Sequence, residues 1–199
     1  MTLRAIIWDI GGVILRTEDR RPRTQLAGRF GMTYEEIEAV IFGGPSSKEA
    51  TVGQIKVERH WENVCKVLKL SPGEIPAFQK EFWGGDRVDM ELIAYIRALR
   101  PRYCTAVLSN AWSDMRSLVE RWGIVDAFDE IIISSEVGAA KPDPRIYQIA
   151  VERLNVSPSE AVFIDDFPQN VEAARAAGLR SIQFTSFAQV RADLEQLMV

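Results

Sequence analysis

The chain has 199 residues, of which 47% are hydrophobic and 26% are charged, a composition typical of a soluble globular protein. This composition excludes a disordered, collagen-like or coiled-coil chain. The formal net charge is -4, from 24 basic and 28 acidic residues. Because no run of Lys or Arg suits a phosphate backbone, we expect no nucleic-acid partner.

The numbers and positions of cysteine and histidine limit the kinds of metal site and catalytic group that the chain can contain. Cys65 and Cys104 lie too far apart in sequence to form a CxxC pair, which indicates reduced thiols rather than a zinc site or a disulfide. His60 is the single histidine, so a multi-histidine metal site is excluded. Any catalysis must therefore rely on carboxylates, hydroxyls and lysine.

The amino-terminal segment has no basic region of the kind that opens a signal peptide, and Asp9 interrupts its apolar run. No stretch reaches the roughly 18 apolar residues that a membrane span needs. We therefore expect a cytoplasmic protein with no membrane partner, and the sequence leaves its oligomeric state open.

Short apolar runs alternate with helical patterns along most of the chain. Five runs have the length of a β-strand: residues 3–8, 103–108, 130–133, 161–164 and 181–184. Helical patterns follow the last four of them, over residues 113–122, 142–154, 168–177 and 187–198. The alternation predicts an α/β fold, a Rossmann-like parallel sheet with helices on both faces. Ligands of such sheets bind beyond the carboxyl ends of the strands.

Between the first two predicted strands, about 70 residues have a helical pattern instead. We expect residues 16–85 to form an inserted helical bundle, and residues 1–15 and 86–199 to form the α/β core. Capping-box spacing occurs in three pairs: Thr33 with Glu36, Ser46 with Glu49, and Ser71 with Glu74. A stripe of apolar residues predicts a helix near residues 57–68, and Asp86 is expected to be the N-cap of the helix that returns to the sheet.

Carboxylates follow two of the predicted strands. Asp9 comes directly after the first strand and is followed by Gly11 and Gly12, which allow close approach of a ligand, while Asp165 and Asp166 follow the fourth strand. In a parallel sheet both strands deliver these groups to the same edge. Unpaired carboxylates there would raise one another's pKa unless a hard cation lay among them, so the sequence predicts a magnesium site.

The second and third predicted strands are followed by polar residues that are not carboxylates. Ser109 and Asn110 end the second strand, where a hydroxyl, an amide and loop N–H groups can bind an oxyanion, although the pair is equally an ordinary turn. Lys141 precedes a helix that begins at Pro142. It either neutralises a phosphate near Asp9 or points to solvent. Together the four strand ends carry the groups that phosphoryl transfer requires.

These segments resemble motifs one to four of the haloacid dehalogenase superfamily, and the insertion is similar to that family's C1 cap. The matching segments are Asp9 with its Gly-Gly-Val tail, Leu108-Ser109-Asn110, Lys141-Pro142-Asp143-Pro144, and Ile164-Asp165-Asp166 with Asn170. The resemblance covers the whole chain. It implies a phosphatase that acts on a small phosphorylated metabolite and forms an aspartyl-phosphate at Asp9.

The resemblance also implies a role for each site residue. Ser109 and Asn110 would hold the phosphoryl oxygens, and Lys141 would offset charge on the nucleophile and the transition state. Asp9, the backbone carbonyl of Gly11 and Asp166 would bind Mg²⁺, with Asp165 acting through a water.

Position 11 departs from the phosphatase pattern of this family, which has a second aspartate there to protonate the leaving group. Here the residue is Gly11. General acid-base help is worth about 10²- to 10⁴-fold in rate. We therefore expect either a substitute acid, for which Glu18 and Asp19 are the nearby candidates, or substrates whose leaving groups are acidic.

Two other functions stay open. Dehalogenases of this family also lack the second aspartate, but they work without metal, and the Asp165-Asp166 pair favours the phosphatase. The other alternative is a binding or regulatory protein that kept the fold and lost efficient catalysis.

Several further side chains have a structural interpretation and a functional one. Trp112, directly after Ser109 and Asn110, has the best claim to the site, although packing is at least as good an interpretation. We expect His60 to lie at the edge of the cap core. Core packing is also the better interpretation for Trp61, Phe82 and Trp83, whereas Arg20, Arg21 and Arg23 form either a solvated face or an anion-attracting rim.

Overall fold

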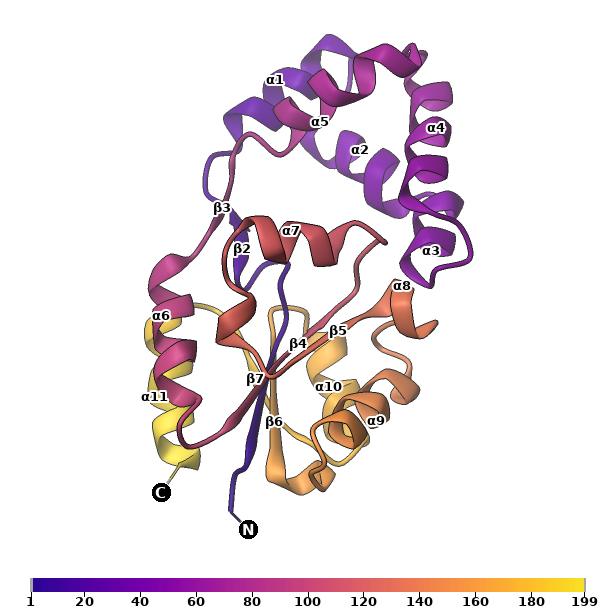
Figure 1. The fold of residues 1–199 in the computed structure, drawn as a ribbon. Helices are drawn as coiled ribbons and strands as arrows, with labels where there is room; N and C mark the ends of the chain where they lie inside the picture. The colour runs from indigo at the N-terminus through magenta and orange to yellow at the C-terminus, as the bar shows by residue number, and fades with distance from the viewer. Residues whose placement is uncertain (1, 199) are drawn as a thin grey trace.

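The computed structural model describes residues 2–198 and contains a parallel five-stranded sheet (Figure 1). Its strands lie in the order β5-β4-β1-β6-β7. Their bounds are β1 (Ala5–Trp8), β4 (Cys104–Ser109), β5 (Glu130–Ile133), β6 (Ala161–Asp165) and β7 (Arg180–Gln183). These agree with the five predicted strands to within two residues at each end and confirm the predicted α/β fold. Because β1 pairs with both β4 and β6, the residue after β1 lies at the centre of the sheet edge.

Alternating side chains of the strands face two separate cores. Ile6 and Trp8 pack into the core covered by α6 (Met90–Leu99), α7 (Met115–Arg121) and α11 (Phe187–Leu197). Ala5 and Ile7 face α9 (Pro144–Arg153) and α10 (Pro168–Ala176) on the other side. Figure 1 shows α6 and α11 on one face and α9 and α10 on the other. Burial on both faces explains why the strands are almost continuously apolar.

The inserted segment packs around a third hydrophobic cluster above the carboxyl ends of the strands (Figure 1). Its helices are α1 (Arg21–Arg29), α2 (Tyr34–Glu38), the π-helix η1 (Ala39–Gly43), α3 (Pro45–Thr51), α4 (Val57–Leu68), the 3₁₀ turn η2 (Pro72–Glu74) and α5 (Ile75–Phe82). Three shorter elements complete the core: η3 (Val125–Ala127), α8 (Ser134–Val137) and η4 (Pro158–Glu160). None of the helices within residues 2–198 combines the length and the apolar character that a membrane crossing demands.

Asp86 is not a helix N-cap, which corrects the sequence-based expectation. Instead β2 (Leu15–Thr17) and β3 (Asp86–Val88) pair in antiparallel fashion and form the two-stranded link between the insertion and the core. The Asp86 carboxylate is engaged by Arg23 and Thr17 and so is not free to cap a helix. The N-cap of α6 lies three residues later, at Asp89, whose side chain accepts the N–H of Leu92.

One of the three expected capping boxes does not form. Thr33 and Glu36 exchange both hydrogen bonds, and the Glu74 carboxylate accepts the N–H and hydroxyl of Ser71. The pair of Ser46 and Glu49 is different, because α3 begins at Pro45 with Gly44 as its N-cap. Pro45 sets the start of the helix two residues earlier than a box with Ser46 as its N-cap requires.

His60 lies inside the insertion rather than at the edge of its core, with no exposed surface. Its Nδ1 is 3.0 Å from the hydroxyl of Ser46, and its ring lies 4.4 Å from that of Trp112 and 5.5 Å from that of Trp61. Burial lowers the pKa of His60. A neutral histidine therefore helps to join the helices of the insertion to the loop that follows β4.

Candidate active site

Three carboxylates from opposite ends of the chain meet at the carboxyl edge of the sheet. Trp8 at the end of β1 pairs with Ile164 of β6, so the residues that follow them are neighbours. Oxygen atoms of Asp9, Asp165 and Asp166 all lie within 4.8 Å of one another. The structure thus brings together the acidic groups that the sequence placed at this edge.

The Lys141 ammonium group lies between two of these carboxylates and does not point to solvent. Its Nζ is 2.8 Å from Asp9 Oδ1 and 2.7 Å from Asp165 Oδ2, and its side chain is 1% exposed. One ammonium against three carboxylates leaves the cluster negative overall. A buried cluster of this charge favours binding of a cation.

Asp165 is fully buried and is held by protein donors. Besides Lys141, its carboxylate accepts the N–H of Phe167 at 2.8 Å and the side-chain amide of Asn170 at 3.1 Å. These contacts occupy both oxygens, so Asp165 is poorly placed to bind a metal ion directly. It orients Lys141 instead.

Asp166 has the opposite character. Its Oδ1 is buried and has no hydrogen-bond partner among residues 2–198. Burial, together with the charge of Asp165, raises the pKa of Asp166. A buried carboxylate oxygen without a donor fits a metal ligand, and the carboxylate oxygens of Asp9 and Asp166 are of the kind that Mg²⁺ prefers.

Gly12 is required for the approach of Asp166. Its φ of +74° is one that side chains rarely adopt, and a Cβ built there would lie 2.1 Å from Asp166 Oδ2. Gly11 differs, because nothing lies within 4 Å of a Cβ built at that position. A side chain at position 12 would therefore displace Asp166, whereas a side chain at position 11 would not collide with the described residues.

Asp9 presents one oxygen to the protein and keeps the other free. Oδ1 accepts the N–H of Ile10 at 2.7 Å and the ammonium of Lys141, while Oδ2 has no donor among residues 2–198. Burial raises the pKa of Asp9 to about 6, and the nearby Lys141 charge opposes this rise. At neutral pH Asp9 is therefore mostly ionised, with Oδ2 available as a nucleophile.

The side chain of Asn110 is engaged with the main chain of Lys141. Its amide donates to the Lys141 carbonyl at 2.8 Å, and its oxygen accepts the Lys141 N–H at 2.7 Å. The side-chain amide of Asn110 is therefore occupied by protein groups, and its backbone N–H, for which residues 2–198 provide no acceptor, stays a candidate for binding a phosphate oxygen. Ser109 is buried at the end of β4, its hydroxyl has no hydrogen bond to another group of residues 2–198, and it stays a candidate phosphate ligand.

Sequence reasoning missed Ser134, which holds the loop after β4 in place. Its hydroxyl accepts the N–H of Ala111 at 2.9 Å and donates to the Thr51 carbonyl of the insertion at 2.6 Å. Its position in the sequence, directly after the third predicted strand and so at the same sheet edge as the other site residues, could have indicated that Ser134 belongs to the site.

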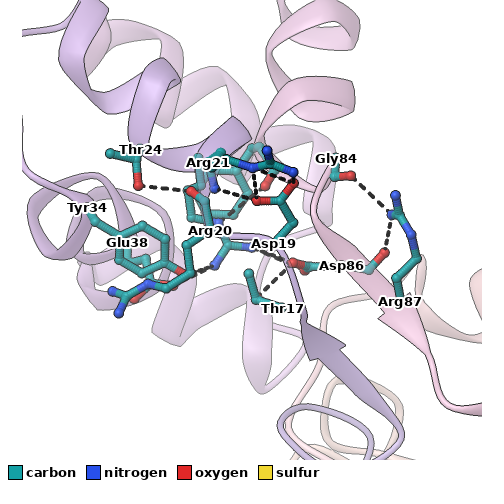
Figure 2. Close-up of polar contacts among 12 residues, drawn as sticks. Thr17, Asp19, Arg20, Arg21, Thr24, Tyr34, Glu38, Gly84, Asp86 and Arg87 are labelled. Carbon is teal, nitrogen blue, oxygen red and sulfur yellow. Dashed lines mark hydrogen bonds and ion pairs between the residues drawn. The ribbon is translucent and has the colours of Figure 1, made fainter.

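Neither expectation for the arginines fits Arg23. It is buried and ion-paired with Glu38 and Asp86, and its Nε donates to the carbonyl of Phe82. Figure 2 shows Asp86 with Thr17 at the base of this network. Arg20 and Arg21, in contrast, form exposed pairs with Glu35 and Asp19.

The nearby loop does not supply an obvious replacement acid. Hydrogen bonds from Arg21 hold the pKa of Asp19 at about 2, so its carboxyl has no proton to donate at neutral pH (Figure 2). Glu18 is exposed, 3.9 Å from Arg16. This argues against Asp19 as a substitute for the acid that Gly11 lacks.

The sequence is similar to that of a known hydrolase family and to those of several characterised proteins. A family model described as haloacid dehalogenase-like hydrolase matches residues 3–178. "Phosphatase MT3486" from Mycobacterium tuberculosis is 29% identical over 96% of this chain and 91% of its own length. Rat bifunctional epoxide hydrolase 2 is 26% identical over 94% of this chain, which spans only 36% of that protein.

A solved structure has the same fold. It is a haloacid dehalogenase family enzyme from Bacteroides thetaiotaomicron, in complex with magnesium and inorganic phosphate. The TM-score is 0.78 at 20% identity, covering 94% of this chain and 98% of that one. The similarity includes both the sheet and the insertion.

Proposed function

This chain belongs to the haloacid dehalogenase-like hydrolases, and on that premise we propose that it is a magnesium-dependent phosphatase acting on a small phosphorylated metabolite. The observation that carries the proposal is the cluster of Asp9, Lys141 and Asp166, in which neither Asp9 Oδ2 nor the buried Asp166 Oδ1 has a hydrogen-bond donor within residues 2–198. The phosphatase relatives and the magnesium-phosphate complex of a structural neighbour support it.

Each residue then has a stated task. Asp9 Oδ2 attacks phosphorus as the bond from phosphorus to the ester oxygen breaks, which gives an aspartyl-phosphate and the released alcohol; water then displaces Asp9 and frees inorganic phosphate. Lys141 offsets the negative charge on Asp9 and on the transferring group. Ser109 and the backbone N–H of Asn110 bind phosphoryl oxygens. Asp9, the Gly11 carbonyl and Asp166 would hold Mg²⁺, which neutralises charge so that two anions can approach.

We further propose that residues 16–85 act as a cap of the C1 type over a core made of residues 1–15 and 86–199. The insertion lies above the carboxyl edge of the sheet, and the β2-β3 pair joins it to the core. A cap in this position shields the site from bulk solvent while the phosphoryl group is transferred to Asp9.

Metal dependence is the first test. We expect turnover of phosphorylated metabolites to require Mg²⁺ and to cease with EDTA, and Asp166→Asn to raise the Mg²⁺ concentration needed by about 10- to 100-fold. Asp126→Asn, which alters an exposed carboxylate paired with Arg97, is the matched control and should keep the parent's requirement. Turnover of a haloacid that ignores EDTA would instead support a dehalogenase.

Magnesium binding should weaken as the pH falls. Protons and Mg²⁺ compete for the same carboxylates, and burial raises the pKa of Asp9 to about 6 and that of Asp166 above its usual value. The apparent affinity for Mg²⁺ is therefore expected to be constant well above pH 6 and to fall below it. Calorimetric titration between pH 5 and 8 measures this, and an affinity that is independent of pH would contradict the proposed ligands.

A further inference from the structure

A cavity of about 570 Å³ lies between the insertion and the core. Five aromatic side chains line it: Phe42, Trp61 and Trp83 from the insertion, and Trp112 and Trp122 from the core. A cavity of this size is large enough to enclose a small organic molecule. The five aromatic side chains suit a ring-shaped occupant. The rest of the wall is partly polar and includes Ser47, Thr51, Gln79 and Arg121.

Phe42 is the clearest sign that the cavity is built for a ligand. It is 43% exposed, and it lies in the π-helix η1, an irregularity that is frequent at functional sites. Its ring stacks on Trp112 at 5.9 Å with an interplanar angle of 26°, and its centroid lies 5.7 Å from that of Trp83. Aromatic surface is thus presented toward the cavity from both sides of the cap-core junction.

The cavity reaches the candidate active site through the loop after β4. Asn110 and Ala111 are part of its wall, and the Asn110 side chain holds the main chain of Lys141. Asp9 itself does not line the cavity. The cavity therefore lies beside the proposed phosphate site and not directly over it. The group esterified to a phosphate bound at Ser109 and Asn110 would extend into this space.

Protonation of the leaving group has little support at this site. Asp9, Asp165 and Asp166 have other tasks, and Asp86, which lines the cavity, is paired with Arg23 through both carboxylate oxygens at 3.1 Å. Asp114 is the remaining carboxyl in the cavity wall, and burial raises its pKa. It is therefore the residue to test as a rival acid.

Resting on the proposed phosphatase function, we propose that the substrates are phosphate monoesters of aromatic alcohols, whose ring lies against Phe42, Trp83 and Trp112 and whose oxygen leaves without being protonated. An Asp9 oxygen forms a bond to phosphorus while the bond from phosphorus to the ring oxygen breaks, and that oxygen departs with the electron pair as a phenolate. Water then attacks phosphorus, Asp9 leaves as a carboxylate, and the proton that the water loses is taken up by the phenolate in solution. Such a leaving group is stable enough to need no general acid.

The first experiment isolates recognition of the ring. Benzyl and cyclohexylmethyl phosphate are similar in size and both release a primary alkoxide, so they differ mainly in aromaticity. We expect a KM about two- to tenfold lower for the benzyl ester. Phe42→Leu should remove this difference, whereas Phe30→Leu should keep it, because Phe30 packs against the hydrophobic cluster of the insertion and is not in the cavity wall.

The second experiment measures the leaving group. Across substituted phenyl phosphates and benzyl phosphate we expect kcat/KM to fall steeply as the basicity of the leaving oxygen rises, by at least about 10²-fold from phenyl to benzyl. Asp114→Asn should leave this slope unchanged. Equal KM for the two ring types, a flat slope, or a slope that steepens in Asp114→Asn would each overturn the proposal. Absence of turnover with every phosphate ester would instead count against the phosphatase function itself.

Discussion

Replacement of Asp9 by Asn is expected to lower kcat by on the order of 10⁴-fold or more, to the background of the assay. The amide keeps the shape of the side chain but cannot form the bond to phosphorus. Steady-state phosphate release measures the loss, and acid-quenched parent enzyme should carry phosphate on the protein, whereas Asp9→Asn should carry none. Asp126→Asn is the matched control and should retain full turnover.

The same variant gives a test of stability that does not depend on activity. Burial raises the pKa of Asp9 from 3.8 to about 6, so its ionised form destabilises the folded chain. That cost is complete above pH 6 and disappears as the pH falls toward 3.8. Asp9→Asn is therefore expected to be at least as stable as the parent at pH 8 and to lose its advantage between pH 6 and 4. Urea unfolding across this range measures it, and a variant unfolded at every pH would show that Asp9 is needed for folding.

Gly11→Asp is expected to raise kcat/KM for benzyl phosphate by about 10²- to 10⁴-fold. The new carboxyl stands where the phosphatases that this chain resembles have their acid, and it has room, because nothing lies within 4 Å of a Cβ at position 11. The slope against leaving-group basicity should become shallow. Turnover of the benzyl ester compared with the phenyl ester measures the effect.

The control for this gain is Gly11→Asn, which has the same shape and no proton to donate. It should show no increase. An equal gain in both variants would mean that bulk at position 11, not proton transfer, improves the enzyme. No gain in Gly11→Asp would mean that an acid is already present, and Asp114 would be the first residue to examine.

The helix capping boxes of the insertion show how far local sequence predicts local structure. The box of Thr33 and Glu36 formed as predicted because it involves groups only three residues apart. Ser46 and Glu49 have the same spacing, yet Pro45 starts the helix earlier. Two local signals therefore compete for the position of the helix start, and the backbone constraint of Pro45 outweighs the capping-box spacing.

The parallel sheet and the edge at which Asp9, Asp165 and Asp166 meet were predictable from residue types alone, because short apolar runs that alternate with helical patterns are a local property of the chain. Which groups pair at that edge follows from the three-dimensional fold and not from any local pattern. Lys141 bridges two carboxylates that are 156 residues apart in the chain, and Arg23 finds Asp86 across 63 residues. Such partners are selected by desolvation and by the closing of long loops, neither of which leaves a periodic pattern in the sequence.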